Sequence, residues 1–200
     1  CTAQALLAII SAAYAIYHGP KGILKIADRT SKLAKLFSEG IKSTGFEILS
    51  DKFFDTVTIK TKNKTKEIYG KALAKKINLR NINNEMISVA FDEAKKLEDV
   101  NILLEIFGLN IKYDQNTKIE LNNIPSQLKR TSEYLTHPVF NKYQSETEML
   151  RYLKKLEDCD IALNRSMIAL GSCTMKLNAT AELIPITWKE FSLPHPFVPI

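Results

Sequence analysis

Cysteine is scarce in this chain, and the few thiols present are far apart. The 200 residues contain three cysteines, Cys1, Cys159 and Cys173, and no two of them form a C-x-x-C pair. An odd number of widely spaced thiols predicts neither a disulfide framework nor a zinc site, and it favours a reducing compartment. We therefore expect a cytoplasmic protein, or one of the mitochondrial matrix if the source is eukaryotic.

Arginine is also scarce, because the net charge of +6 comes from 23 lysines and only five arginines against 22 acidic residues. A nucleic-acid-binding protein concentrates basic residues on one face, often with stacking aromatics between them. Here the lysines are spread along the chain, as at Lys21, Lys25 and Lys32. The charge pattern favours an ordinary solvated surface, with nucleic-acid binding kept as a third alternative.

Charge is absent altogether from residues 1–17, whose apolar residues recur at helical spacing. The stretch has no basic residues before it and is short for a bilayer, so it predicts neither a signal peptide nor a membrane span. The chain opens on Cys1, and Pro194 to Ile200 do not resemble a natural end. We therefore expect a piece of a longer protein, with enough apolar residues (45%) to form a core.

Helical and strand patterns alternate along residues 1–108. The first helix is expected to stop at His18-Gly19-Pro20, and a second, beginning at Pro20, to end near Gly45. Strands are expected at 46–49, 54–60, 77–79 and 87–91, the last two joined by a turn at Asn83-Asn84, with helices at 65–76 and 99–107. The order predicts the α/β class, with a small α+β layer packed against two long helices.

The residues after 108 are expected to form a connection and a further helical segment. Residues 109–136 are rich in Asn, Gln and Lys, which favours a linker between domains. Ser145 and Glu148 have the spacing of a capping box, in which each side chain satisfies the other end of the first helical turn. The helix that follows is expected to bury four apolar side chains, Met149, Leu150, Leu153 and Leu156.

The residues best suited to chemistry lie in one short loop, Ala169 to Asn178. Gly171 frees backbone N–H groups, and small polar side chains with a lysine follow it, a combination that suits a carboxylate or a phosphate. These side chains are Ser172, Cys173, Thr174, Lys176 and Asn178. On composition alone, a structural loop is the better interpretation.

Several longer segments, in this order along the chain, resemble the glycine cleavage system P-protein, a family of glycine decarboxylases that depend on pyridoxal phosphate (PLP). The segments are Cys1 to Leu6, Tyr17 to Pro20, Thr136 to Asn141, Ser145 to Tyr152, Ser166 to Asn178, Pro185 to Trp188 and His195 to Phe197. Ordered matches of this length are more specific than any single short motif. The resemblance is weakest between residues 42 and 130.

The resemblance implies two homologous halves, each with a type I PLP-dependent transferase fold, of which this chain holds a central part. Residues 1–45 would be closing helices of the first large domain, and 46–108 a small α+β domain. Residues 109–136 would be the linker, and 137–200 the opening segment of the second, catalytic half. The parent would be a homodimer or a paired assembly of halves.

The resemblance also implies the reaction and its partners. Glycine is decarboxylated with PLP as the electron sink, and the aminomethyl group passes to the lipoyl arm of the H-protein. In that family the lysine that binds PLP follows a histidine, and no His-Lys pair occurs here. The cofactor anchor is therefore expected outside this chain, which would carry no catalytic residue and be inactive alone.

Within this chain, the resemblance makes the loop side chains and His195 candidates for contact with cofactor or substrate. For Lys176, contact with an anion is favoured over formation of an imine. His137 is interpreted as a residue that starts a helix, and Trp188 and Phe197 as core or interface aromatics. Arg165, Ala169 and Gln144 depart from the family's usual His, Pro and His. The main alternative function is a non-catalytic protein-interaction module; we expect neither nucleic-acid nor membrane binding.

Overall fold

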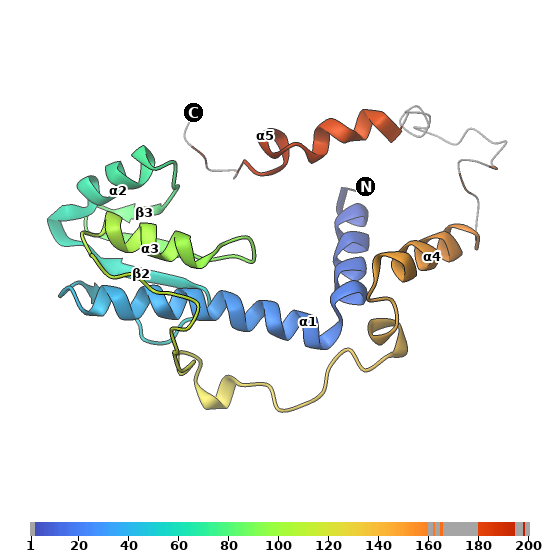
Figure 1. Ribbon diagram of the computed structural model, residues 1–200, viewed down its shortest axis with the longest axis horizontal. Helices are drawn as coiled ribbons and strands as arrows, with labels where there is room; N and C mark the ends of the chain where they lie inside the picture. The colour runs from blue at the N-terminus through green and yellow to red at the C-terminus, as the bar shows by residue number, and fades with distance from the viewer. Residues whose placement is uncertain (1–2, 160–161, 163–164, 166–179, 195–197, 199–200) are drawn as a thin grey trace. The chain divides into compact units, whose positions relative to one another are not determined.

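The computed structural model describes residues 3–159, 162, 165, 180–194 and 198 (Figure 1). The chain divides into two compact units, which are treated separately below. Unit 1 combines residues 1–19 with 137–200, and unit 2 is the continuous stretch 20–136. Helices and a small antiparallel sheet make up the described residues, which confirms the predicted mixed α/β class.

Helix α1 (Ala3–Lys42) consists of two helical sections that meet at Gly19. Gly19 has φ 61° and ψ −179°, a backbone conformation that is essentially confined to glycine. A Cβ atom on Gly19 would also come within 2.6 Å of the carbonyl oxygen of Phe140, another residue of unit 1. Pro20, which has no N–H to leave unpaired, then begins the second section. The predicted stop at His18-Gly19-Pro20 is confirmed.

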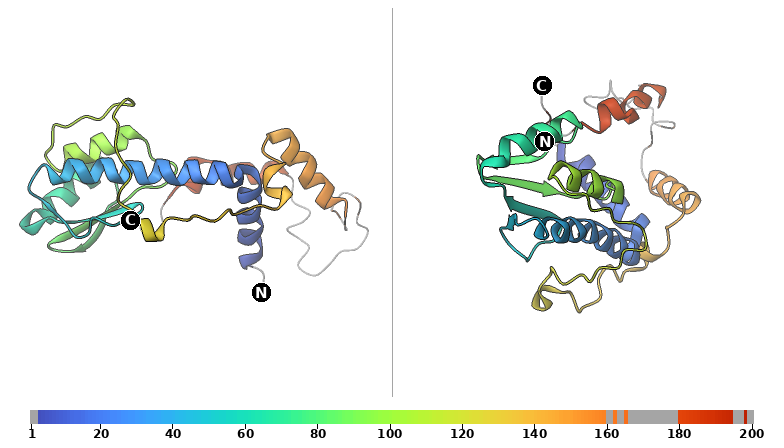
Figure 2. Two further views of the ribbon diagram at one scale, coloured as in Figure 1. Left: turned by 90° about the horizontal axis from the view of Figure 1, so that it is seen from below. Right: turned by 60° about the vertical axis from the view of Figure 1, so that its left-hand side comes forward.

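Unit 2 contains a small antiparallel sheet (Figure 2). The sheet has four strands in the order β1-β2-β4-β3. The strands are β1 (Glu47–Ile48), β2 (Thr56–Lys60), β3 (Arg80–Asn83) and β4 (Met86–Ala90). In the central pair, Val57 lies opposite Val89 and Ile59 opposite Ile87. Because alternate residues share a face, these four side chains form the apolar side of the sheet. Strands were expected at three of these four places.

The core of unit 2 joins that face to three helical segments. These are the second section of α1, α2 (Thr65–Ala74) and α3 (Leu97–Ile106). The ring of Phe37, fully buried in α1, lies 5.7 Å from that of Phe91 and 5.6 Å from that of Phe107. The first section of α1 contributes no residue to this cluster. Of the two long helices predicted for the α+β layer, only the second is therefore part of its core.

The strand predicted at 77–79 is wrong, and the structure places β3 later, at Arg80–Asn83. Helix α2 ends with Lys76 in the left-handed region at φ 58°. The N–H groups of Lys76 and Ile77 donate to the carbonyls of Leu73 and Ala72, each at 2.9 Å, in a Schellman motif. Ile77, which the sequence pattern assigned to the start of the strand, belongs to this turn. The hairpin turn moves with it, to residues 84–85.

In unit 1, α4 (Glu146–Glu157) follows the short 3-10 helix η3 (Pro138–Asn141). Ser145 Oγ accepts from the Glu148 N–H at 3.3 Å, which confirms the predicted helix start. The predicted burial is wrong: Leu150, Leu153 and Leu156 are 66%, 44% and 49% exposed. The cap determines where α4 begins. Whether the apolar face of α4 is buried depends on other elements that pack against it.

Short elements complete the described ranges: the 3-10 helices η1 (Lys62–Lys64), η2 (Ser126–Leu128) and η5 (Thr180–Thr187), and α5 (Lys189–Ser192).

Across the described residues, no helix is both long and apolar enough to cross a membrane.

Candidate functional site

The loop side chains singled out in the sequence lie outside the described residues, as do His195 and Phe197. The loop side chains are Ser172, Cys173, Thr174, Lys176 and Asn178. Their assignment to a cofactor or substrate site therefore stays a prediction. The structure describes residues that precede and follow this loop in the sequence.

Arg165, just before the loop, is bound to the C-terminal end of α4. Its Nη1 pairs with Asp158 Oδ1 at 2.8 Å, and its Nη2 donates to the carbonyl oxygen of Glu157 at 2.5 Å. A cation at this end of a helix is favoured by the exposed carbonyls and the helix dipole. Hydrogen bonding from Lys154 and then Arg165 lowers the pKa of Asp158. Arg165 thus has a structural task at the C-terminal end of α4.

His137 and Gln144 both hold the turn that precedes α4. His137 Nδ1 accepts from the N–H of Val139 at 3.2 Å, which caps η3 and confirms the prediction that His137 starts a helix. Gln144 Nε2 donates to the carbonyl oxygen of Phe140 at 3.1 Å. A ring nitrogen occupied as a cap is a poor general base, because its lone pair is already engaged.

Trp188 is 52% exposed, and its ring lies 6.2 Å from that of Phe191. Trp188 therefore lies outside the core of the described residues, and its role as an interface aromatic stays a prediction.

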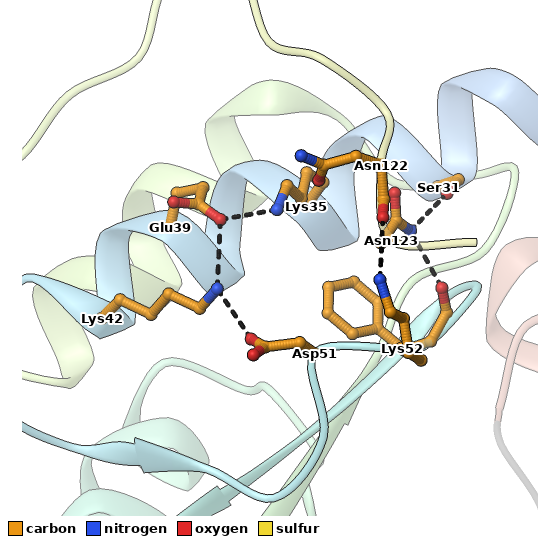
Figure 3. A network of polar contacts seen from close by, with 9 residues as sticks. Ser31, Lys35, Glu39, Lys42, Asp51, Lys52, Asn122 and Asn123 are labelled. Atoms are coloured by element: carbon orange, nitrogen blue, oxygen red, sulfur yellow. Dashed lines mark hydrogen bonds and ion pairs between the residues drawn. The ribbon is translucent and has the colours of Figure 1, made fainter. Parts of the chain in front are cut away.

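The segment predicted to be a linker, residues 109–136, is fastened to unit 2 by a buried side chain. Asn123 is 1% exposed, and its Nδ2 donates to Ser31 Oγ and to the carbonyl oxygen of Phe53, each at 2.9 Å (Figure 3). The Phe53 N–H returns a bond to the Asn123 carbonyl at 3.2 Å. Nothing in the sequence marked this asparagine, because one Asn in a polar stretch resembles its exposed neighbours.

A chain of ion pairs lies beside that anchor (Figure 3). Glu39 pairs with Lys35 at 2.7 Å, and Lys42 reaches both Glu39 at 3.4 Å and Asp51 at 2.8 Å. The hydrogen bond from Lys35 lowers the pKa of Glu39, and the one from Lys42 lowers the pKa of Asp51. The bond to Asp51 raises the pKa of Lys42. Each shift moves the pKa away from neutrality, so these groups hold fixed charges and do not exchange protons near pH 7.

Two of the open grooves on unit 2 are defined by the residues that line them. One of about 600 Å³ lies between Asp28, Arg29 and Lys32 of α1 and residues 115–119 and 121. The other, of about 560 Å³, lies between α3 and residues 109–112. Arg29, the strongest anion-binding group of the first, already donates to the carbonyls of Glu93 and Lys95. Within the described ranges, no cluster of three or more His, Cys, Asp or Glu side chains is suited to a metal ion.

Two of the described lysines are poorly suited to binding the aldehyde of PLP. A lysine that binds an aldehyde needs a lowered pKa, whereas ion pairing raises the pKa of both Lys42 and Lys154. Neither groove contains an enclosed arrangement of donors for a phosphate group.

Comparison with known proteins decides the family. The family model of the glycine cleavage system P-protein matches residues 1–107. The chain belongs to the glycine cleavage system P-protein family. Similarity extends over all 200 residues to proteins named glycine dehydrogenase (decarboxylating): 63% identity to that of Pelagibacter ubique and 52% over 204 aligned residues to that of Photobacterium profundum. The protein of that name from Paraburkholderia xenovorans is 48% identical over 209 aligned residues.

The chain spans 21% of the length of each of these P-protein relatives, although all of its own residues align with them. The recognition made from the ordered segments is thereby confirmed, and the chain corresponds to a fragment of such a protein.

Proposed function

We propose that this chain is a non-catalytic part of a PLP-dependent glycine decarboxylase, and that the whole protein transfers the aminomethyl group of glycine to a lipoylated H-protein. The observation that carries the proposal is the 63% identity over the entire chain to a protein named glycine dehydrogenase (decarboxylating). We place the protein in the cytoplasm, or in the mitochondrial matrix of a eukaryote. It would act as a homodimer or a paired assembly of halves.

The two units would contribute differently to that protein. Unit 2 is built around its own core, and Lys35, Glu39, Lys42 and Asp51 are held in ion pairs, which suits a structural domain. Unit 1 would bring the loop with Ser172, Thr174 and Lys176 to the cofactor or the glycine carboxylate. In this proposal, Lys176 supplies a positive charge, and the lysine that binds PLP lies outside residues 1–200.

Borohydride reduction of the full-length protein with PLP tests where the cofactor is attached. We expect one labelled lysine, identified by peptide mass spectrometry, at a position outside this chain and directly after a histidine. A stoichiometric label on Lys176 would overturn the assignment of that lysine as an anion contact.

Exchange of labelled carbon dioxide into glycine, in the presence of lipoylated H-protein, tests the reaction and the loop together. Lys176→Ala is expected to lower kcat/KM for glycine by about 10- to 100-fold, the loss typical of one charge-assisted contact. Lys155→Ala, a change of the same kind at an exposed position of α4, is the matched control and should leave the rate unchanged. Equal rates in both variants would remove Lys176 from the site, and absence of exchange in the unaltered protein would reject the function itself.

A protein-interaction module remains the second candidate, and the exposed leucines of α4 are the observation that favours it. An unaltered full-length protein with no exchange activity would leave it as the better account.

A further inference from the structure

An open groove in unit 2 is bordered by two parts of the chain that lie far apart in sequence. One wall consists of Asp28, Arg29 and Lys32 of α1, and the other of residues 115–119 and 121. It is named the α1 groove because α1 forms one of its walls. Its volume of about 600 Å³ lies within the range of ligand-binding clefts, which makes it a candidate binding surface.

The wall formed by the chain after α3 is held in place at both ends. The Asn101 side chain bonds both backbone groups of Tyr113, donating to its carbonyl at 3.0 Å and accepting from its N–H at 2.9 Å. At the other end, Asn123 is the buried anchor shown in Figure 3. Between these anchors, the Thr117 N–H and hydroxyl donate to the carbonyl oxygen and Oδ1 of Asp114, at 3.1 and 2.9 Å. The α1 groove is therefore preformed, and a ligand does not have to order this wall.

Arg29, on the opposite wall, is also held in place. Its Nη1 and Nη2 donate to the carbonyl oxygens of Glu93 and Lys95, at 2.7 and 2.5 Å. A guanidinium has five N–H groups, so two bonds to neutral carbonyls leave it three donors and its full charge. Because these bonds already order the Arg29 side chain, contact with an anion costs less side-chain entropy.

A stripe of basic side chains continues from the α1 groove along the helix. Lys21, Lys25 and Lys32 follow one another at intervals of four and seven residues, so they lie along one side of α1. At a rise of about 1.5 Å per residue, the stripe is about 16 Å long. Among the described residues, these three lysines and Lys118 of the opposite wall form no ion pair, and Asp28 is the only acidic residue that lines the groove. The groove and the stripe together thus carry a net positive charge.

The lining of the α1 groove favours an acidic peptide over a nucleic acid. Among the described residues, no aromatic side chain lines the groove for a base to stack on, and Asp28 would repel a phosphate. Ile119 and Leu121 give the groove an apolar portion, which suits an aliphatic side chain. The side-chain amides of Gln115 and Asn116 are suited to bonding the backbone of an extended chain.

We propose that the α1 groove and the stripe of Lys21 and Lys25 form a docking site for an extended acidic segment of a partner protein. Inside the groove, Lys32 and Lys118 pair with carboxylates of the segment, and an aliphatic side chain contacts Ile119. Farther along α1, Lys25 and then Lys21 pair with the next carboxylates. The inference concerns unit 2 alone and does not depend on the proposed reaction.

Fluorescence anisotropy of a labelled peptide tests this site in the full-length protein. The probe is a peptide of about eight residues in which glutamate and leucine alternate, because an extended chain of that length covers the groove and the stripe. Lys32→Gln combined with Lys118→Gln should weaken binding about tenfold at low ionic strength, through the loss of two charge-assisted contacts. Lys66→Gln combined with Lys155→Gln removes the same charge at exposed positions outside the site. This matched control should bind the peptide as tightly as the unaltered protein does.

The same assay can overturn the proposal in several ways. The peptide could fail to bind the unaltered protein, or both double variants could lose the same affinity. A peptide with glutamine in place of glutamate could bind as tightly as the acidic one. Tighter binding of single-stranded DNA with the same number of negative charges, lost in the Lys32→Gln and Lys118→Gln double variant, would assign the groove to nucleic acid and also reject the proposal.

A shorter peptide tests the contribution of the stripe. An acidic peptide of about four residues fills the groove but does not extend to Lys21. Lys21→Gln combined with Lys25→Gln should weaken binding of the longer peptide about fivefold and leave the affinity of the shorter one unchanged. Equal weakening for both peptides, or none for either, would contradict an extended segment that runs from the groove along α1.

Discussion

The large apolar side chains of unit 2 and of unit 1 differ in how far they are buried. Unit 2 buries Phe37, Ile59 and Ile87 completely between its sheet and helices. Unit 1 leaves Leu7 and Leu150 each 66% exposed. Both units show clear apolar periodicity in sequence, so the periodicity is not what distinguishes them. The difference is that the elements covering unit 2's apolar faces lie within the chain.

The comparison shows how a piece of a larger protein can contain one complete core beside one incomplete surface. Residues 3–17, in the first section of α1, carry no charged side chain. A helix that is apolar all round is normally buried on every side. Since the relatives are about five times longer than this chain, we expect their additional residues to cover this helix and α4.

The largest expected effect separates the two units directly. Phe37→Ala removes a fully buried ring that contacts two others, and it should lower the free energy of unfolding of unit 2 by about 3–5 kcal/mol. Leu150→Ala, at an exposed position, should change stability by less than about 0.5 kcal/mol in the 200-residue chain. Urea unfolding followed by hydrogen exchange in β2 and β4 reports on unit 2, and fluorescence of Trp188, the single tryptophan, reports on unit 1.

Leu150→Ala can also be compared between the 200-residue chain and the full-length protein. There the α4 face is expected to be covered, and Leu150→Ala should cost about 2 kcal/mol or more. Equal small effects in the short and the full-length protein would show that this face is exposed in both.

Local chemistry in the sequence was sufficient to predict most element boundaries. Gly19 and Pro20 mark the break in α1, because only glycine accepts that backbone and proline suits a first turn. Ser145 marks the start of α4 through its cap. The alternation in residues 56–60 predicted β2 because one face of that strand is buried.

The errors have two causes, a turn that its own residues do not signal and contacts with residues that are distant in sequence. Lys76 takes the left-handed role that Gly108 takes at the end of α3, and a lysine gives no signal of such a turn. The burial of Asn123 depends on Ser31 and Phe53, which are far away in sequence. Of the candidate site, the capping role of His137 was predictable from its place before Pro138, whereas the task of Arg165 depends on where α4 ends.

An intermediate effect tests how completely the core of unit 2 is filled. A Cβ atom on Gly40 would lie 2.5 Å from Cδ2 of the fully buried Leu104, whereas one on Gly70 meets nothing within 4 Å. Both glycines are helical, and alanine favours a helix by about 1 kcal/mol over glycine. Gly70→Ala should therefore raise the free energy of unfolding by about that amount. Gly40→Ala should lower it by about 1 kcal/mol, because overpacking exceeds the helical gain.

Those two alanine variants share one measurement, the urea midpoint of unit 2, and each serves as the control for the other. If Gly40→Ala were as stabilising as Gly70→Ala, Leu104 would have free space beside it, and the contrast between a filled unit 2 and an uncovered unit 1 would weaken.

The smallest expected effect concerns a surface charge. It tests whether the stability of unit 2 depends on surface ion pairs as well as on its core. Glu39→Gln removes the carboxylate shared by Lys35 and Lys42, and the loss should be about 0.5 kcal/mol at neutral pH, since Glu39 is 40% exposed. The pKa of Glu39 is lowered from 4.5 by Lys35, so its stabilising effect is complete above pH 4.5 and fades as pH falls through the lower folded pKa.

The two urea midpoints, for the unaltered chain and Glu39→Gln, should therefore converge on acidification below pH 4.5. Glu67→Gln, which breaks the more exposed pair with Lys71, is the control and should have a smaller effect at neutral pH. A gap that persisted in acid would mean that Glu39 acts through packing, because a protonated carboxyl and an amide then differ little in charge. In that case the stability of unit 2 would rest on contacts between side chains even at its most charged surface.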